Sequence, residues 1–249
     1  MGNAGMIELW KTEPVFVLTT DIDWASEYSI DTLLGFAGER GIVPTAFMTH
    51  SSEVLAAAAR QGKVDLGIHP NFLPGSTHGV AAPEVIRHCL DFAPGARVSR
   101  SHAFVDGTHV ALALREAGIA VDSNLCLYLQ PGLGPLRHWT GIVRLPVFWE
   151  DDIHWMSRGS WRLADHEAVF FTPGLKIINV HPFNFALNLA DQAGYLAAKP
   201  MLTGLTAAAA VAGRKPGAGT ATFLGELCDA VARRGYRWHR LLDTIAPAT

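Results

Sequence analysis

The sequence predicts a single α/β domain over residues 1–249, built on a parallel β-sheet that is either open or closed into a barrel. Two observations predict this fold class. Short apolar runs typical of buried strands alternate along the chain with segments of helical periodicity. Apolar residues make up 49% of the chain and charged residues 17%, which is enough for a large core and unlike a disordered composition.

The first strand is expected over residues 14–20, where the run PVFVLTT is apolar and rich in β-branched and aromatic side chains. A helix over 29–40 should follow, with Ser29 as its N-cap and Gly41 at its end. A long polar loop is expected over 70–82. The other predicted elements are strands 42–49, 64–69, 97–100, 119–122, 141–148 and 176–181, and helices 52–61, 83–92, 108–117 and 222–234.

Composition and charge exclude several classes of protein. The formal charge is −3, from 20 basic and 23 acidic residues, and no basic run is interleaved with aromatics, so no nucleic-acid partner is expected. The longest weakly polar run, residues 201–213, is shorter than the roughly 20 residues of a membrane span. Three widely spaced cysteines and the lack of a secretory signal favour a reducing cytoplasm. The oligomeric state is not predicted.

Polar side chains follow the predicted strands at the point where each strand ends. In parallel α/β folds, binding and catalytic sites form at these carboxyl ends. Five separate segments therefore direct carboxylates, imidazoles and a guanidinium to one rim. They are Asp21 with Asp23, His69, Arg100 with His102, the run Glu150, Asp151, Asp152 and His154, and His181.

Asp21 and Asp23 are open to two interpretations. Either could cap a helix, which is an ordinary role for an aspartate after a strand. In extended backbone, however, both would project to the same side, and two close like charges favour a nearby cation or an acid–base role. One carboxylate with two imidazoles matches a catalytic zinc site, although cobalt and nickel accept such ligands too. These parts suit metal-assisted hydrolysis of an amide or ester.

In order and spacing, these segments resemble the motifs of the polysaccharide deacetylase family (the NodB-homology, carbohydrate esterase family 4 fold). The resemblance implies a distorted (β/α) barrel of about seven parallel strands and removal of N-acyl groups from sugars. The loop HPNFLPGSTHG and the run FWEDD look most like a branch linked to O-antigen and other surface-sugar gene clusters. The matching segments are residues 19–24, His69, residues 100–102, residues 148–152 and residues 179–181.

The resemblance also implies the metal ligands. Asp23 would be one ligand, and His69 corresponds to the first of two histidines that the family places four residues apart. The second position holds Leu73, so the nearest candidate for the missing ligand is His78, with Asn71 as a weaker one. One divalent metal, zinc before cobalt or nickel, is the implied cofactor.

The implied catalytic residues come from the remaining motifs. Asp21 would be the general base and His181 the general acid. Arg100 would orient the catalytic acid, and either Asp151 or Asp152 would fix the tautomer of His181. Residues expected to bind substrate are Trp24, Asn71, His102, Trp149 and Glu150. Four tryptophans, Trp24, Trp149, Trp155 and Trp161, could form a sugar-stacking platform.

The preferred hypothesis is a metal-dependent deacetylase or deformylase acting on an amino sugar or a lipid- or nucleotide-linked sugar precursor. Two alternatives stay open. A metal-independent glycosidase could pair Asp21 or Asp23 with Glu150 across the barrel. A non-catalytic sugar-binding protein on the same scaffold would explain the altered second motif, because losing a ligand is one route to an inactive enzyme.

Overall fold

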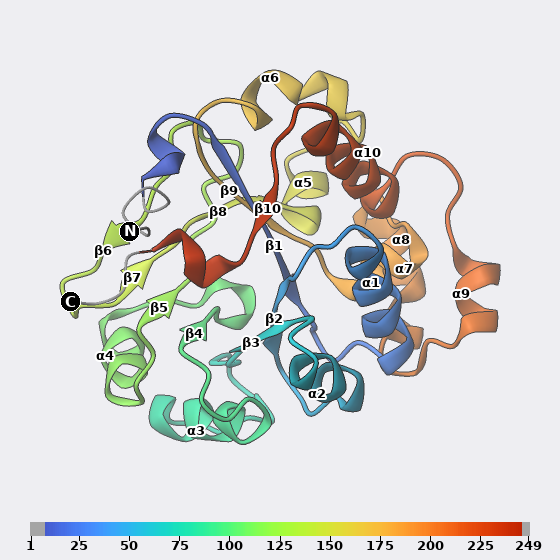
Figure 1. The fold of residues 1–249 in the computed structure, drawn as a ribbon. Coiled ribbons are helices and arrows are strands. Elements are labelled where there is room, and N and C mark those ends of the chain that lie inside the picture. Colours follow the sequence, from blue (N-terminus) through green and yellow to red (C-terminus); the bar gives the residue numbers. More distant parts are fainter. Residues whose placement is uncertain (1–7, 246–249) are drawn as a thin grey trace.

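The computed structural model describes residues 8–245, and the strands within that range form one curled sheet (Figure 1). The strand order is β6-β7-β5-β4-β3-β2-β1-β9-β8, with β10 paired to β1. Every pairing is parallel except β6 with β7. The strands are β1 (Pro14–Asp21), β2 (Thr45–Met48), β3 (Asp65–Ile68), β4 (Val98–Ser99), β5 (Val121–Asp122), β6 (Leu136–Arg137), β7 (Val143–Arg144), β8 (Val147–Glu150), β9 (Gly174–Asn179) and β10 (Trp238–His239).

Backbone hydrogen bonds join β8, at one end of the strand order, to the chain that directly follows β5. Leu127 N donates to Val147 O at 2.9 Å, and Val147 N donates to Leu125 O at 2.8 Å. This link makes the sheet a distorted (β/α) barrel, as predicted. The expected strand 141–148 is divided into β7 and β8, because Pro146 between them has no N–H for a sheet hydrogen bond.

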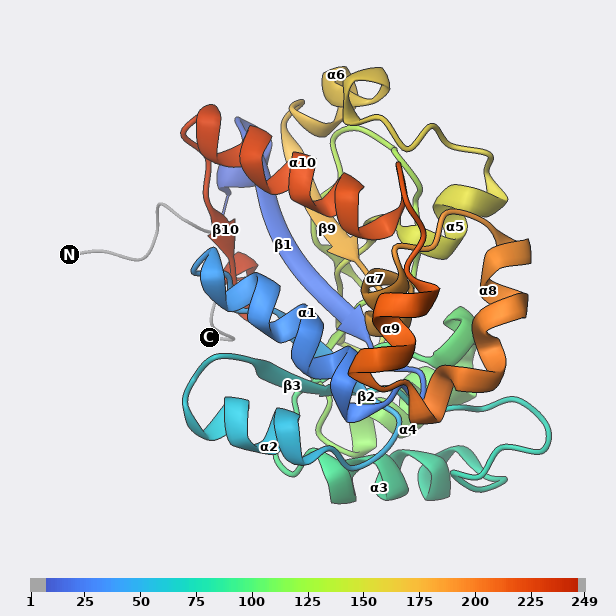
Figure 2. The ribbon, with the colours of Figure 1, turned by 90° about the vertical axis from the view of Figure 1, so that its right-hand side faces the viewer.

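Helices cover the outside of the sheet, and α2, α3 and α4 follow one another around the lower part of Figure 1. Figure 2 shows α1 and α10 lying over β1, and both helices contact α7. The helices are α1 (Glu27–Glu39), α2 (Glu53–Arg60), α3 (Ala82–Phe92), α4 (Thr108–Glu116), α5 (Asp151–Met156), α6 (Glu167–Phe170), α7 (Pro182–Leu187), α8 (Gln192–Ala198), α9 (Ala207–Gly213) and α10 (Thr220–Arg233). Short 3₁₀ helices are η1 (Leu9–Lys11), η2 (His102–Phe104), η3 (Leu163–Asp165), η4 (Lys199–Gly204) and η5 (Leu241–Thr244).

The start of α1 differs from the sequence prediction. Ser26, rather than Ser29, is the N-cap, and its hydroxyl accepts from Ser29 N at 3.3 Å. Ser26 is extended and its hydroxyl also donates to Leu205 O, which ties the helix start to the chain after η4. The helix therefore begins nearer the end of β1, which shortens the loop that carries Asp23.

Two apolar clusters form the core. One joins β1, β8 and β9 to α10, and the other lies among α1 to α4, α7 and α9. All eight residues of β1 are buried, because helices cover one side of the strand and the barrel interior the other. With β1 fixed in this way, its carboxyl end is held in the middle of one rim of the barrel.

Candidate metal centre and acid–base groups

Asp23, His69 and His102 form a compact group at the carboxyl ends of β1, β3 and β4. Asp23 Oδ1 lies 3.2 Å from His69 Nε2 and 3.0 Å from His102 Nδ1. Each residue offers one ligand atom, and these atoms lie within 4.8 Å of one another. Burial alone would raise the pKa of Asp23, but hydrogen bonds from His102 and His69 hold it well below its usual range. One carboxylate and two imidazoles suit a divalent metal such as zinc.

Neighbouring backbone fixes the orientation of these groups. His69 Nδ1 donates to the carbonyl oxygen of Arg100 at 2.7 Å, and Nε2 faces Asp23. Asp23 and Trp24 both have positive φ, at 40° and 57°, and Trp24 N donates to Thr49 Oγ1 at 3.0 Å. This tight turn after β1 brings the Asp23 carboxylate towards the histidines.

Asp21 lies next to this group, with Oδ1 3.9 Å from His69 Nδ1, and is held by two buried donors. Arg100 Nη1 donates to Asp21 Oδ1 at 2.9 Å, and Asn179 Nδ2 donates to Asp21 Oδ2, also at 2.9 Å. Arg100 is completely buried and also donates to Ser123 O and Oγ, Thr19 Oγ1 and Asn179 Oδ1. The guanidinium thus fixes the Asp21 carboxylate from inside the barrel, whereas the resemblance implied that it would orient the catalytic acid, and His181 pairs with Asp151 instead.

His181 and Asp151 form a second pair, which faces the other carboxylate oxygen of Asp23. His181 Nδ1 donates to Asp151 Oδ1 at 2.6 Å, and its Nε2 lies 3.6 Å from Asp23 Oδ2. Asn184 Nδ2 and the backbone N–H of His181 both donate to Asp151 Oδ2. Burial alone would lower the pKa of His181, but the Asp151 carboxylate raises it well above its usual value. His181 therefore presents Nε2 towards Asp23 and the candidate metal ligands.

Glu150 and Asp152 place two more carboxyl groups beside His181. Glu150 accepts from Asn179 Nδ2 at 3.0 Å. Burial, followed by the charge of Asp152, raises the pKa of Glu150 well above its usual value. Oδ1 of Asp152 is buried and has no hydrogen-bond partner among the described residues. Glu150, Asp152 and His181 also meet the spacing of a metal group, but they offer two carboxylates and only one imidazole.

The structure does not bring His78 to the metal-binding group. Its Nε2 lies 2.8 Å from Thr49 O, and its Nδ1 accepts from Asn71 N at 3.1 Å. Both ring nitrogens therefore serve to hold the loop that follows β3. Asn71 Oδ1 accepts from Leu73 N within the same loop. His102, which was expected among the substrate-binding residues, is the imidazole that lies beside Asp23 and His69 instead, so it replaces His78 as the candidate third ligand.

The tryptophans separate into buried and partly exposed ones. Trp149 is fully buried, stacks on Phe223 with ring centroids 4.8 Å apart, and donates from Nε1 to His154. The expectation that Trp149 binds substrate is therefore wrong, because its ring is enclosed in the core. Trp24 and Trp155 are partly exposed, and the Trp24 ring lies 5.3 Å from that of His102.

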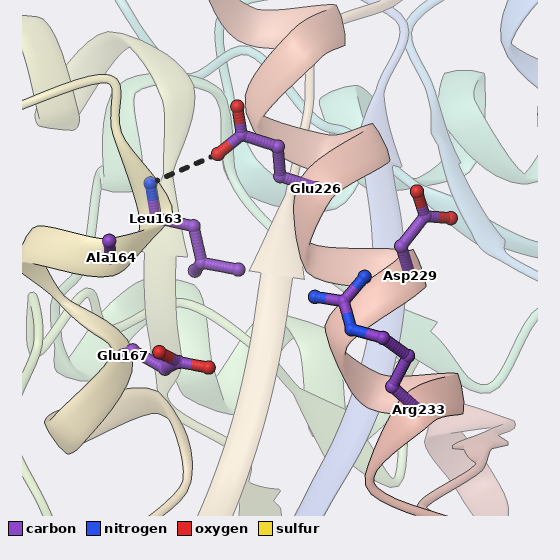
Figure 3. A pocket seen from close by; sticks show the side chains of 6 residues that line it. All are labelled: Leu163, Ala164, Glu167, Glu226, Asp229 and Arg233. Carbon is purple, nitrogen blue, oxygen red and sulfur yellow. Dashed lines mark hydrogen bonds between the residues drawn. The ribbon is translucent and has the colours of Figure 1, made fainter.

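A surface hollow of about 260 Å³ lies between α10 and the segment 163–167 (Figure 3). It contains none of the residues predicted for the site, and one of its carboxylates, Glu226, accepts from Leu163 N at 3.2 Å. This hollow is separate from the groups that carry chemistry. None of the helices within residues 8–245 combines the length and apolar character that a membrane span requires.

Comparisons with known proteins bear on this arrangement. A structure from Bordetella bronchiseptica, described as a polysaccharide deacetylase involved in O-antigen biosynthesis, is 28% identical, with a TM-score of 0.79 over 89% of this chain and 91% of that chain. A peptidoglycan N-acetylglucosamine deacetylase, at 13% identity, TM-score 0.51 and coverage of 96% and 95%, shares the fold. So does a 4-alpha-glucanotransferase from Thermococcus litoralis, at 12% identity, TM-score 0.53 and coverage of 93% and 38%.

No curated protein matches the chain in sequence. A family model, by contrast, matches residues 18–199, which contain every residue predicted for the site. The chain therefore belongs to the WbmS-like polysaccharide deacetylase family.

Proposed function

We propose that this protein is a metal-dependent hydrolase that removes an N-acyl group, acetyl or formyl, from an amino sugar or a sugar-linked precursor of a surface polysaccharide. The observation that carries the proposal is the group of Asp23, His69 and His102, which lies within 4 Å of both Asp21 and His181. The three cysteines are free, which suits a protein of the reducing cytoplasm. A substrate in that compartment would be a precursor of the polysaccharide.

Asp23, His69 and His102 would hold the metal. Their donors fit a divalent ion because they combine one carboxylate oxygen with two imidazole nitrogens and leave further positions free. Such an ion, zinc before cobalt or nickel, would polarise the acyl carbonyl and make a water molecule more acidic. Asp23 and His102 are about a quarter exposed at their side chains, so this face of the group is open to substrate.

Asp21 is the proposed general base. Its carboxylate is fixed by Arg100 and Asn179 and has no freedom to turn away from the incoming water. Arg100 also keeps a positive charge 2.9 Å from Asp21 Oδ1, on the side of the carboxylate that lies inside the barrel. Asp21 therefore takes the proton of the attacking water.

His181 is the proposed general acid. Its Nδ1 proton is bound by Asp151, so Nε2 carries the proton available to the leaving nitrogen. The raised pKa keeps the imidazole protonated near neutral pH. Proton transfer from Nε2 releases the amino sugar as a neutral amine rather than an unstable anion.

A metal-independent glycosidase is the main alternative. Asp21 Oδ2 and Glu150 Oε2 accept from the same Asn179 amide nitrogen, so two carboxyl groups lie close together inside the barrel. The raised pKa of Glu150 would suit a general acid. This function leaves His69 and His102 without a chemical role, and a chelator separates it from a metal-dependent hydrolase.

The proposal predicts acetate or formate release from N-acylated amino sugars, measured with purified protein on a panel containing UDP-N-acetylglucosamine, chitotriose and N-formyl analogues. A chelator should abolish release and zinc should restore it. Asp21→Asn should lower the rate by at least about 100-fold, as for loss of a general base. Activity that survives the chelator, or release of free sugar in place of acid, would contradict the proposal.

Metal content tests the ligand assignment separately. We expect about one zinc per chain in the parent and its loss in His102→Ala. His78→Ala is the matched control, because it removes an imidazole from the adjacent loop without removing a proposed ligand. Zinc lost from His78→Ala and kept by His102→Ala would reverse the assignment.

A further inference from the structure

Tyr195 lies on α8, beyond the last sequence motif, which ends at His181. Its ring is partly exposed and contacts two other aromatic rings. The ring centroid lies 6.0 Å from that of Trp155 and 6.3 Å from that of Phe183. The Lys199 ammonium lies 5.8 Å from the Tyr195 ring centroid. These contacts restrict the orientation of the ring.

The two aromatic neighbours belong to the helices that begin at the proposed acid pair. Trp155 lies one turn after Asp151 on α5, so the two side chains share a face of that helix. Phe183 follows His181 by two residues at the start of α7. Tyr195 thus lies against both helices that carry the His181–Asp151 pair.

The hydroxyl of Tyr195 has no hydrogen-bond partner among residues 8–245 and is not buried. Tyr128 differs in this respect, because its hydroxyl lies 2.7 Å from His154 Nδ1 inside the protein. Burial raises the pKa of Tyr195, and the carboxylates of Asp23 and Asp152 raise it further. These carboxylates belong to the site, so the phenol lies within the reach of its charges.

We infer that the Tyr195 hydroxyl donates a hydrogen bond to the sugar portion of the substrate, on the side of the leaving nitrogen. This inference rests on the proposed function, in which the leaving nitrogen takes its proton from His181. The sugar that carries this nitrogen must then lie over His181 and Asp151, where α5, α7 and α8 meet. A fixed, unpartnered hydroxyl at that point distinguishes sugars by the position of their own hydroxyl groups.

Tyr195→Phe removes this oxygen and keeps the ring and its packing. Loss of one neutral hydrogen bond should raise KM, or the dissociation constant of the sugar, by about three- to tenfold. The ratio of kcat/KM for an N-acetylated sugar to kcat/KM for 4-nitrophenyl acetate should also fall. The second substrate has no sugar, so loss of the Tyr195 hydroxyl should affect it less. Tyr236→Phe is the matched control, since Tyr236 packs on Phe16 and Phe171 near the amino ends of the strands.

Binding of UDP-N-acetylglucosamine and chitotriose to chelated protein, measured by ligand-observed NMR, provides a readout that does not need turnover. Weaker sugar binding in Tyr195→Phe, with Tyr236→Phe equal to the parent, supports the inference even if the parent releases no acid and the proposed function fails. Active parent protein with no difference between parent and Tyr195→Phe, in KM, selectivity or binding, would overturn the inference and leave the proposed function standing.

Discussion

At Asp23, Trp24, Ala103 and Phe104 the backbone adopts positive φ values that residues with side chains rarely take. Each such residue costs of the order of 1–3 kcal/mol, and residues of this kind cluster where function requires a particular geometry. The first of these turns contains the proposed ligand Asp23, and the second directly follows the proposed ligand His102. The strain therefore lies where the chain must turn sharply to bring ligands from separate strands together.

The pairing of His181 with Asp151 predicts a specific pH dependence. The acid must be protonated to act, so activity is present below the raised pKa of His181 and is lost as pH rises through it. Asp151→Asn removes the carboxylate that favours the imidazolium, and the alkaline limb of the kcat profile should move to lower pH by about one unit or more.

The pH profile of kcat, with a neighbouring surface change as control, checks this prediction. Asp165→Asn alters an exposed carboxylate outside the site and should leave the limb in place. An alkaline limb that stays at the parent position in Asp151→Asn would remove His181 from the role of general acid.

At the scale of elements, the strands that form the site were predictable because they are uninterrupted apolar runs. β1, β3 and β9 lie within one or two residues of their predicted ends, and each is followed by a predicted site residue. The helices between β9 and α10 were not predicted. All six residues of α7 are buried, so the helix shows no alternation of polar and apolar faces, and α8 and α9 have only seven residues each.

The alternation of side chains along β8 explains why the prediction of Trp149 as a substrate-binding residue was wrong. Trp149 and Glu150 are consecutive residues of a strand, so their side chains point to opposite faces. Glu150 contacts Asn179 inside the barrel, whereas Trp149 packs on Phe223 of α10 outside it. The two side chains therefore could not both face the substrate. The conformations of the loops that carry His78 and His102, by contrast, depend on tertiary contacts that no sequence spacing records.

Helix α5 contains a buried histidine that should make the protein sensitive to acid. His154 Nδ1 accepts from both Tyr128 Oη and Trp149 Nε1, and its Nε2 donates to Ser160 O, so the ring is neutral. Burial lowers the pKa of His154 to about 4. Between the unfolded value near 6.5 and about 4, the unfolded chain binds more protons than the folded one. The free energy of unfolding should therefore fall as pH decreases through this window.

Denaturant unfolding at several pH values checks this expectation. His154→Gln should give a flatter dependence of the free energy of unfolding on pH between about 7 and 4. His109→Gln, at an exposed position on α4, is the control and should keep the slope of the parent. Equal slopes in the parent and in His154→Gln would show that other groups cause the acid sensitivity.

For the whole molecule, the candidate metal site joins parts of the sheet that are distant in sequence. Asp23 follows β1, His69 follows β3 and His102 follows β4, and these strands lie within the neighbouring run β4-β3-β2-β1 of the strand order. Without a cation, two imidazoles and several carboxylates are gathered at a partly buried rim, where hydrogen bonds and the neighbouring imidazoles offset their desolvation. A metal ion would connect three strand ends and stabilise the folded state without requiring any change of fold.

Zinc should therefore raise the thermal midpoint of metal-free protein. At a free concentration of about 1,000 times the dissociation constant, binding stabilises the folded state by roughly 4 kcal/mol. For a chain of this size that corresponds to a shift of roughly 10 °C. Asp23→Ala should abolish the shift, whereas Asp229→Ala, which removes an exposed carboxylate of α10, should preserve it. Calorimetry of the three proteins with and without zinc checks the prediction. A parent midpoint that zinc leaves unchanged would mean that the three strand ends do not form a metal site in the folded protein.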